Sequence, residues 1–369
     1  MNFDNVKTIL DHALTEQNIP CSDIAVSVDG KIVYRYMNGT RDSQKSEAVR
    51  GDELYFLYSA TKLMTCTAAL QLYEKGEITL EDEVSKYIPE FKNLLVKRDS
   101  GLFPEQNPLT IKHLFTMTSG MNYDIKNEVI REQIERKPES TTLDLVRVMA
   151  QMPLEFEPGT HFKYSLSHDV LAAIIEIVSG MRFGEYLQKH IFDVCRMENT
   201  YVGVTEALRS RICSQYIYVS QTGCTELTKT ENPFILTPNY ESGGAGVVSC
   251  VEDYMRFANA LVSGESLLKR TTVDLMRTEH ISAAAYEDFQ SVKKGYSYGL
   301  GVRTNTKDNF SAKGEFGWDG AAGAYVMLDP DNHLAVFYAT YVRNRGNFLY
   351  DKLHPQLRDE VYRSLGLRT

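Results

Sequence analysis

The pattern of hydrophobic and polar positions at the two ends of the chain predicts one shared unit. Residues 3–17 carry apolar side chains at helical spacing, and residues 24–36 have the pattern of two strands joined by an Asp-Gly turn. Strand-like runs at 322–328 and 334–342 precede a helical stretch from Leu353 to Leu365. Because a two-stranded hairpin is barely stable alone, we expect both ends to build one antiparallel sheet that the two terminal helices cover.

The middle of the chain is mostly helical by the same criterion. Apolar side chains recur at spacings of three and four over residues 60–75, 110–119, 142–152, 167–179, 183–193 and 252–263. Residues 100–108 and 153–160 have the composition of loops. We therefore predict an α+β fold in which residues 1–58 and 240–369 form an α/β sandwich around the antiparallel sheet. Residues 59–239 form a mostly helical inserted domain, with a ligand site at the seam.

Composition and charge narrow the function. The 369 residues are 43% hydrophobic and 24% charged, which is typical of a soluble globular protein. The formal charge is −9, from 40 basic and 49 acidic residues, so we expect neither a nucleic-acid partner nor an acidic membrane surface. No run of about 18 apolar residues occurs, and Asp4, Lys7 and Asp11 interrupt any export signal near the start. We therefore expect a cytoplasmic protein.

Residue spacing also argues against a bound cofactor. The six cysteines form no C-x-x-C pair and the eight histidines form no H-E-x-x-H, so we expect scattered buried thiols and no metal. The glycine run Gly243–Gly246 lacks the Lys-Ser/Thr that follows a phosphate-binding loop. It is expected to be a tight turn that binds no nucleotide.

The segment Ser59-Ala-Thr-Lys62 is the first candidate for chemistry, because it opens the helical stretch 60–75. A serine at a helix start lies near unpaired N–H groups, and a lysine three residues later lies on the same face. Burial lowers the pKa of a lysine, so a partly desolvated Lys62 can activate the Ser59 hydroxyl. The rival interpretation is a helix-capping serine, since S-x-x-K also occurs at Ser266 and Ser291.

Besides Ser59–Lys62, further blocks occur in a fixed order at residues 109–120, 158–165, 174–180, 243–249 and 316–323. Together these blocks resemble the serine β-lactamase and penicillin-binding-protein superfamily in its class C-like branch. That branch also holds esterases and D-aminopeptidases. The resemblance covers nearly the whole chain and implies the same two-part fold, with Ser59 as the nucleophile.

The second motif of the family, normally Tyr-x-Asn, falls on Tyr164-Ser-Leu166. The resemblance implies that Tyr164 is a general base, which requires Lys62 and nearby dipoles to stabilise its phenolate or to share its proton. Leu166 replaces the asparagine and can neither donate nor accept a hydrogen bond, so it favours an apolar acyl or alcohol group. Possible polar substitutes are Ser165, Ser167 and His168.

The third motif, normally Lys-Thr-Gly or His-x-Gly, falls on Trp318-Asp319-Gly320, which contains the only tryptophan of the chain. An indole cannot hold a substrate carboxylate and Asp319 would repel one, so a carboxylate-bearing substrate is disfavoured. Gly320 allows a close backbone approach. The resemblance implies that the N–H groups of Ala321 and Ser59 form an oxyanion hole, in which each donor is worth about 10²–10³ in rate.

These replacements predict a serine hydrolase without a cofactor, most simply a carboxylesterase for a small-molecule substrate with a small or medium acyl group. The same site could serve an acyltransferase or a D-amino-acid amidase or peptidase, with at most weak β-lactamase activity. A non-catalytic penicillin-binding-like receptor is the remaining alternative, although Ser59, Lys62 and Tyr164 are all present. The oligomeric state and the natural substrate stay open.

Overall fold

A seven-stranded antiparallel sheet organises the computed structural model, which describes residues 1–42, 44 and 46–368. Its strand order is β10-β11-β12-β13-β14-β1-β2, so the two ends of the chain meet where β1 pairs with β14. The sheet that both termini were predicted to share is therefore confirmed. Its strands are β1 (Cys21–Val28), β2 (Lys31–Gly39), β10 (Ser297–Tyr298), β11 (Arg303–Thr304), β12 (Phe316–Gly317), β13 (Tyr325–Asp329) and β14 (Leu334–Ala339).

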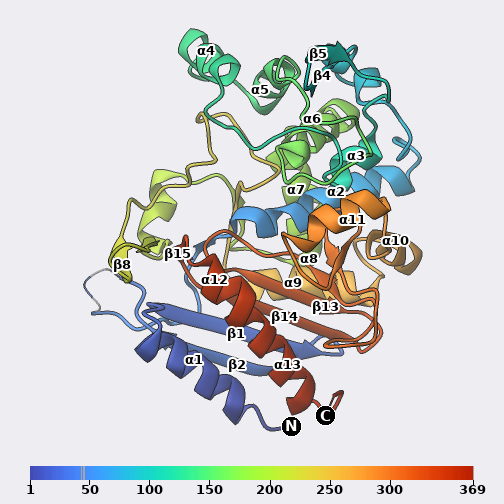
Figure 1. The fold of residues 1–369 in the computed structure, drawn as a ribbon. Helices are drawn as coiled ribbons and strands as arrows, with labels where there is room; N and C mark the ends of the chain where they lie inside the picture. The colour runs from blue at the N-terminus through green and yellow to red at the C-terminus, as the bar shows by residue number, and fades with distance from the viewer. Residues whose placement is uncertain (43, 45, 369) are drawn as a thin grey trace.

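Helices cover both faces of this sheet. On one face lie α1 (Asp4–Glu16) and α13 (His354–Ser364), as predicted, and α9 (Val251–Ser263) packs on the other face (Figure 1). Every residue of β14 is buried, as expected for a central strand with both faces covered. The Tyr254 ring of α9 stacks on the Phe337 ring of β14 at 4.0 Å, which fixes this helix on the sheet.

Most of the remaining helices follow the predicted pattern and gather at one end of the sheet, whereas α12 leads into α13 (Figure 1). The stretch predicted at 110–119 ends early, because Met117 adopts a left-handed φ of 56° that a helix cannot contain. The helices α4, α10 and α11 were not predicted. The full set of remaining helices is α2 (Thr61–Glu74), α3 (Ile111–Phe115), α4 (Glu128–Arg136), α5 (Thr142–Met149), α6 (Ser167–Ser179), α7 (Phe183–Leu187), α8 (Asp193–Cys195), α10 (Arg270–Met276), α11 (Ala283–Gln290) and α12 (Gly346–Phe348).

Short irregular helices connect several of these elements. The predicted helix 183–193 is continuous from α7 through the π-helical turn η4 into α8. The 3₁₀ turns are η1 (Tyr58–Ala60), η2 (Val84–Lys86), η3 (Pro89–Phe91) and η5 (Glu206–Arg211), and the π-helical turns are η4 (Gln188–Phe192) and η6 (Leu349–Leu353). Of these, η1 positions the candidate nucleophile.

Three small sheets complete the structure. The predicted loop 100–108 is wrong in part, because Gly101–Pro104 forms β5, which pairs with β4 around a tight turn. The strands β6 and β7 both pair with strands from the C-terminal part of the chain, through β9 and β15. The small strands are β3 (Tyr55–Phe56), β4 (Leu95–Arg98), β5 (Gly101–Pro104), β6 (Tyr201–Val202), β7 (Tyr216–Val219), β8 (Cys224–Leu227), β9 (Val247–Ser249) and β15 (Val342–Arg343). The predicted domain boundary between residues 239 and 240 stays a prediction.

None of the helices that the structure describes combines the length and the apolar character needed to cross a bilayer. Four cysteine thiols, those of Cys21, Cys66, Cys213 and Cys250, are buried and free, and Cys195 is half-buried. The thiol of Cys224 lies outside the described side chains.

Candidate active site

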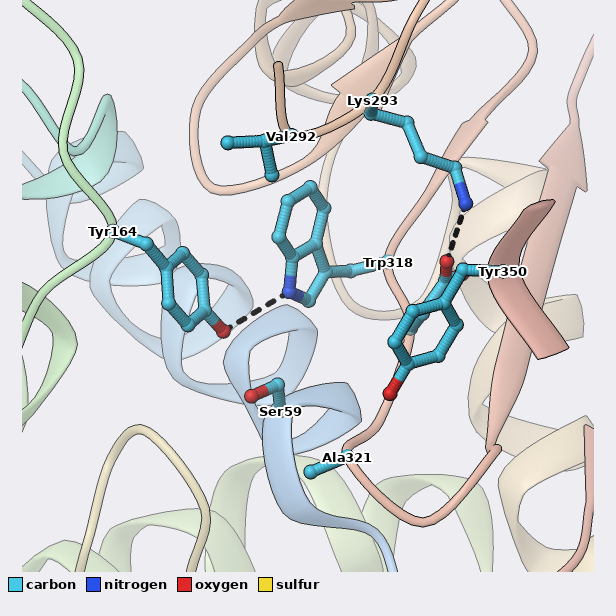
Figure 2. A pocket seen from close by; sticks show the side chains of 8 residues that line it. Ser59, Tyr164, Val292, Lys293, Trp318, Ala321 and Tyr350 are labelled. Carbon is cyan, nitrogen blue, oxygen red and sulfur yellow. Dashed lines mark hydrogen bonds and ion pairs between the residues drawn. The ribbon is translucent and has the colours of Figure 1, made fainter. Parts of the chain in front are cut away.

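A cavity of about 270 Å³ opens at the start of α2 (Figure 2). Segments that are far apart in sequence contribute its walls. The lining residues are Ser59, Tyr164, Val292, Lys293, Trp318, Asp319, Ala321 and Tyr350. The cavity thus brings together the first, second and third predicted motifs, and its other walls come from two segments to which no site residue was assigned.

Ser59 enters the cavity from a constrained turn. The strand β3 leads through Leu57 and the buried Tyr58 into η1 and then α2. Tyr58 has a left-handed φ of 46°, which is strained for a bulky side chain. Its ring packs on Phe56 and Phe234, and these contacts hold it in place. The strained turn points the Ser59 hydroxyl into the cavity (Figure 2).

Lys62 is fully buried beneath Ser59. Its Nζ donates to Ser59 Oγ at 3.3 Å and to the carbonyl oxygen of Gly244 at 2.7 Å. The same nitrogen lies 4.8 Å from the ring centre of Tyr164 and 5.5 Å from that of Tyr123. The glycine run was expected to be only a tight turn, but its Gly244 carbonyl oxygen accepts a hydrogen bond from Lys62.

The charge state of Lys62 differs from the expectation. Burial alone lowers the pKa of Lys62, as predicted, but its interactions with Tyr123, Tyr164 and Asp169 outweigh burial, so the pKa is raised above its ordinary value. The expectation of a lysine made basic by desolvation is therefore wrong. Lys62 is an ammonium group at neutral pH, and it serves Ser59 as a hydrogen-bond donor.

Tyr164 and Trp318 form a hydrogen-bonded pair on one side of Ser59. The indole Nε1–H of Trp318 donates to the Tyr164 hydroxyl oxygen at 3.1 Å, and the two rings stack with centres 5.7 Å apart. Figure 2 shows the Tyr164 and Ser59 hydroxyls pointing into the same cavity. The Tyr164 ring also stacks parallel to Tyr123, with ring centres 5.5 Å apart. These contacts hold the phenol oxygen above Ser59.

Ala321 lines the opposite side of the cavity, and Gly320 explains how its backbone comes so close to Ser59. A Cβ atom at Gly320 would lie 2.3 Å from the carbonyl oxygen of Leu57, two residues before Ser59. The Gly320 N–H donates to Ala324 at 2.8 Å, and the Tyr350 hydroxyl donates to the Gly320 carbonyl at 3.0 Å. The missing side chain therefore lets the segment that carries Ala321 pack directly against the backbone that carries Ser59.

Comparison with known proteins agrees with this geometry. A sequence profile described as Beta-lactamase matches residues 6–354. The chain belongs to the beta-lactamase family. Among curated relatives, the esterase EstB of Burkholderia gladioli is 27% identical, covering 96% of this chain and 93% of its own. The acyltransferase calJ of Penicillium decumbens is 27% identical, covering 88% and 84%. The solved structure of EstCE1, a hydrolase with promiscuous acyltransferase activity, superposes with a TM-score of 0.81 at 23% identity, covering 97% and 98%, and supports the fold.

The third family motif normally supplies a lysine, and this chain has Trp318 there. The cation that lines this cavity is Lys293, which lies outside that motif. Lys293 lines the cavity (Figure 2), and its Nζ lies 2.7 Å from Asp319 Oδ2. Arg303 approaches the other oxygen of Asp319 at 3.5 Å. Burial alone would raise the pKa of Asp319, but Lys293 and Arg303 hold it well below its ordinary value. Asp319 is therefore an anion neutralised by neighbouring cations.

The residues that surround the second family motif lie mostly inside the core. Leu166 is 2% exposed and belongs to the main hydrophobic core, so a contact with substrate stays a prediction. Ser165 and Ser167 are buried and hydrogen-bond to each other at 2.7 Å. Burial also lowers the pKa of His168 to about 3, so this histidine is neutral at physiological pH.

Sequence patterns missed several residues of the site: Tyr123, Gly244, Val292, Lys293 and Tyr350. Lys293 belongs to the S-x-x-K segment that begins at Ser291; it is half-buried, whereas its polar neighbours Ser291 and Lys294 are exposed. For Tyr123 the available signal was its place in the sequence, three residues after the end of the family block 109–120. Within the described residues, no group of His, Cys, Asp or Glu side chains has the arrangement of a metal site.

Proposed function

We propose that the protein is a carboxylesterase that hydrolyses small-molecule esters of small or medium acyl groups through an acyl-Ser59 intermediate. The observation that carries the proposal is the hydrogen bond from the buried Lys62 ammonium to Ser59 Oγ, in a cavity that Tyr164 also lines. The predicted catalytic set is Ser59, Lys62 and Tyr164. The proposal includes the predicted division of the chain, with this site at the seam of the two domains.

In the first half-reaction, Ser59 Oγ attacks the ester carbonyl and passes its proton to the Tyr164 oxygen in its phenolate form. The Lys62 ammonium and the Trp318 N–H both face that oxygen or its ring, and both favour negative charge there. Tyr164 then delivers the proton to the departing alcohol as the C–O bond breaks. In the second half-reaction, water attacks the acyl group with Tyr164 as base, and Ser59 recovers its proton.

The predicted oxyanion hole consists of the backbone N–H groups of Ser59 and Ala321. The close packing at Gly320 supports this assignment, because it brings the two backbone segments to the same side of the cavity. The aromatic walls formed by Tyr164, Trp318 and Tyr350 suit an apolar acyl or alcohol group. A cavity of about 270 Å³ limits the size of the group that can be buried.

The names of the relatives support hydrolysis and acyl transfer alike. One is named an esterase and another an acyltransferase. Both reactions share the acyl-serine intermediate and differ in whether water or an alcohol or amine accepts the acyl group. Acyl transfer is therefore the second candidate for this chain.

The proposal is tested with purified protein and p-nitrophenyl acetate and butyrate. We expect turnover, covalent labelling by a fluorophosphonate, and loss of both in Ser59→Ala. The matched control is Ser291→Ala, which alters the exposed serine of another S-x-x-K segment and should keep full activity. Full activity in Ser59→Ala would refute the assignment.

The same preparation separates the alternatives. A fall in free acid when an alcohol is added would favour acyl transfer over simple hydrolysis. Turnover of a chromogenic cephalosporin at ordinary enzymatic rates would identify a β-lactamase. A stable acyl adduct by intact-mass measurement, without turnover, would favour a receptor.

A further inference from the structure

Asp169 is a buried carboxylate that the proposed reaction does not use. It lies in the first turn of α6 and is 1% exposed. Its Oδ1 accepts hydrogen bonds from the Tyr240 hydroxyl and the Ser242 hydroxyl, both at 2.7 Å, and from the Gly244 N–H at 3.4 Å. Its Oδ2 has no hydrogen-bond partner among the described residues. A buried oxygen without a partner is costly, so a compensating charge nearby is expected.

Lys62 supplies that charge. A Cβ atom at Gly244 would lie 2.8 Å from Asp169 Oδ2 and 3.1 Å from Lys62 Nζ, so the two charged atoms are separated by about 6 Å at most. Gly244 does not adopt a left-handed φ, so its backbone conformation does not demand glycine. The missing side chain leaves open the space between the carboxylate and the ammonium group.

The same contacts also place the lysine. Asp169 accepts a hydrogen bond from the backbone N–H of Gly244. The carbonyl oxygen of the same glycine accepts the 2.7 Å hydrogen bond from Lys62. We infer that Asp169 is a positioning residue that fixes the loop around Gly244 and keeps Lys62 protonated beneath Ser59. This inference rests on the proposed function, because its readout is the esterase reaction.

The other groups that face this pair are phenols, a thiol and an imidazole. The rings of Tyr123 and Tyr164 both lie near the Lys62 ammonium group. Burial raises the pKa of Tyr123, so its phenol is neutral at physiological pH. Cys66 has a pKa raised by burial and is a neutral thiol. His168 is a neutral imidazole because its pKa is lowered. Asp169 is thus the carboxylate among the groups that act on Lys62.

The test compares Asp169→Asn with Tyr240→Phe and Ser242→Ala. The first variant removes the charge and keeps the shape, whereas the other two each remove one hydrogen bond to Asp169 and keep the charge. Background-corrected kcat for p-nitrophenyl butyrate is measured from pH 6 to pH 10. For Asp169→Asn we expect kcat at pH 7 within about threefold of the wild type, and an alkaline fall displaced to lower pH by about one to three units. The two control variants should keep the wild-type profile even if their melting temperatures fall.

Three results would overturn the inference: an Asp169→Asn profile that superposes on the wild type, an equal displacement in Tyr240→Phe, or a higher kcat at neutral pH in Asp169→Asn. The third would mean that a neutral Lys62 is the productive form. If Asp169→Asn does not fold, Asp169→Ser replaces it, and failure of both to fold would show a structural role instead. A wild-type protein without esterase activity would refute the proposed function itself.

Discussion

The hydrogen bond between Trp318 and Tyr164 permits a quantitative test of whether the reaction passes through the Tyr164 phenolate. Trp318→Phe keeps an aromatic ring against Tyr164 and removes the N–H donor, which lies 3.1 Å from the phenol oxygen, together with part of the buried indole. A hydrogen bond of equal strength in the ground and transition states leaves kcat unchanged. A bond to a charged oxygen contributes about 1.5–3 kcal/mol, against about 1 kcal/mol for a neutral one. When the phenolate must first form from the neutral phenol, the difference of about 0.5–2 kcal/mol corresponds to a fall in kcat of about 2- to 30-fold.

The assay is a double-mutant cycle with Trp318→Phe, Tyr164→Phe and the double variant, using p-nitrophenyl butyrate turnover and the rate of fluorophosphonate labelling. If the indole acts through the Tyr164 oxygen, Trp318→Phe should have no further effect once that oxygen is gone. Melting temperatures control for lost packing, because Trp318 is 8% exposed and also contacts Tyr298 and Phe289. An unchanged kcat in Trp318→Phe, or full additivity in the double variant, would refute the reasoning.

Three further predictions concern the framework of the site. Gly320→Ala places a Cβ atom 2.3 Å from the Leu57 carbonyl oxygen. We expect this variant to lower kcat/KM by about 100-fold or more, because it displaces one oxyanion donor. Steady-state kinetics and the melting temperature check this prediction, and wild-type kinetics would contradict it. Lys293→Met leaves the partly buried Asp319 without its nearest cation and should destabilise the fold by about 1–3 kcal/mol, measured by urea unfolding, with the exposed Lys294→Met as control. His168 has a folded-state pKa of about 3, below its ordinary 6.5, so its contribution to stability is complete above pH 6.5 and is lost as pH falls toward 3. That contribution amounts to about 5 kcal/mol, and His168→Gln should flatten this part of the acid unfolding curve; a curve parallel to the wild type would contradict it.

Much of the framework could be predicted from local patterns. Helical spacing located α1 and α13 to within a few residues, because each helix buries one face. The strands β1, β2, β13 and β14 were located by short runs of strand-forming residues bounded by turn residues. The short helices α10 and α11 and the small strands were missed or misplaced, since elements of two to eight residues carry too few periods to stand out. The hairpin of β4 and β5 was mistaken for a loop for this reason.

The candidate active site, like the fold, could be predicted only in part from the sequence. The spacing of Ser59 and Lys62 placed the two side chains on one face of a helix start, and their hydrogen bond at 3.3 Å follows from that spacing. The family order of the motifs brought Tyr164, Trp318 and Ala321 into consideration, and the fold places all three around one cavity. Nothing local indicated that Lys293 would reach the cavity from the turn after α11, because that contact depends on how α11 and α13 pack around the end of the sheet.

The sequence by itself determined which residue types could do chemistry, which segments form the sheet and which positions a helix turn brings together. Only the tertiary structure decided the charge on Lys62 and the surroundings of Asp319. Burial lowers the pKa of Lys62, whereas Tyr123, Tyr164 and Asp169 raise it, and these partners come from two segments that are both distant from Lys62 in the sequence. A pKa is the sum of all such interactions in space, and a linear spacing rule contains only those between neighbours.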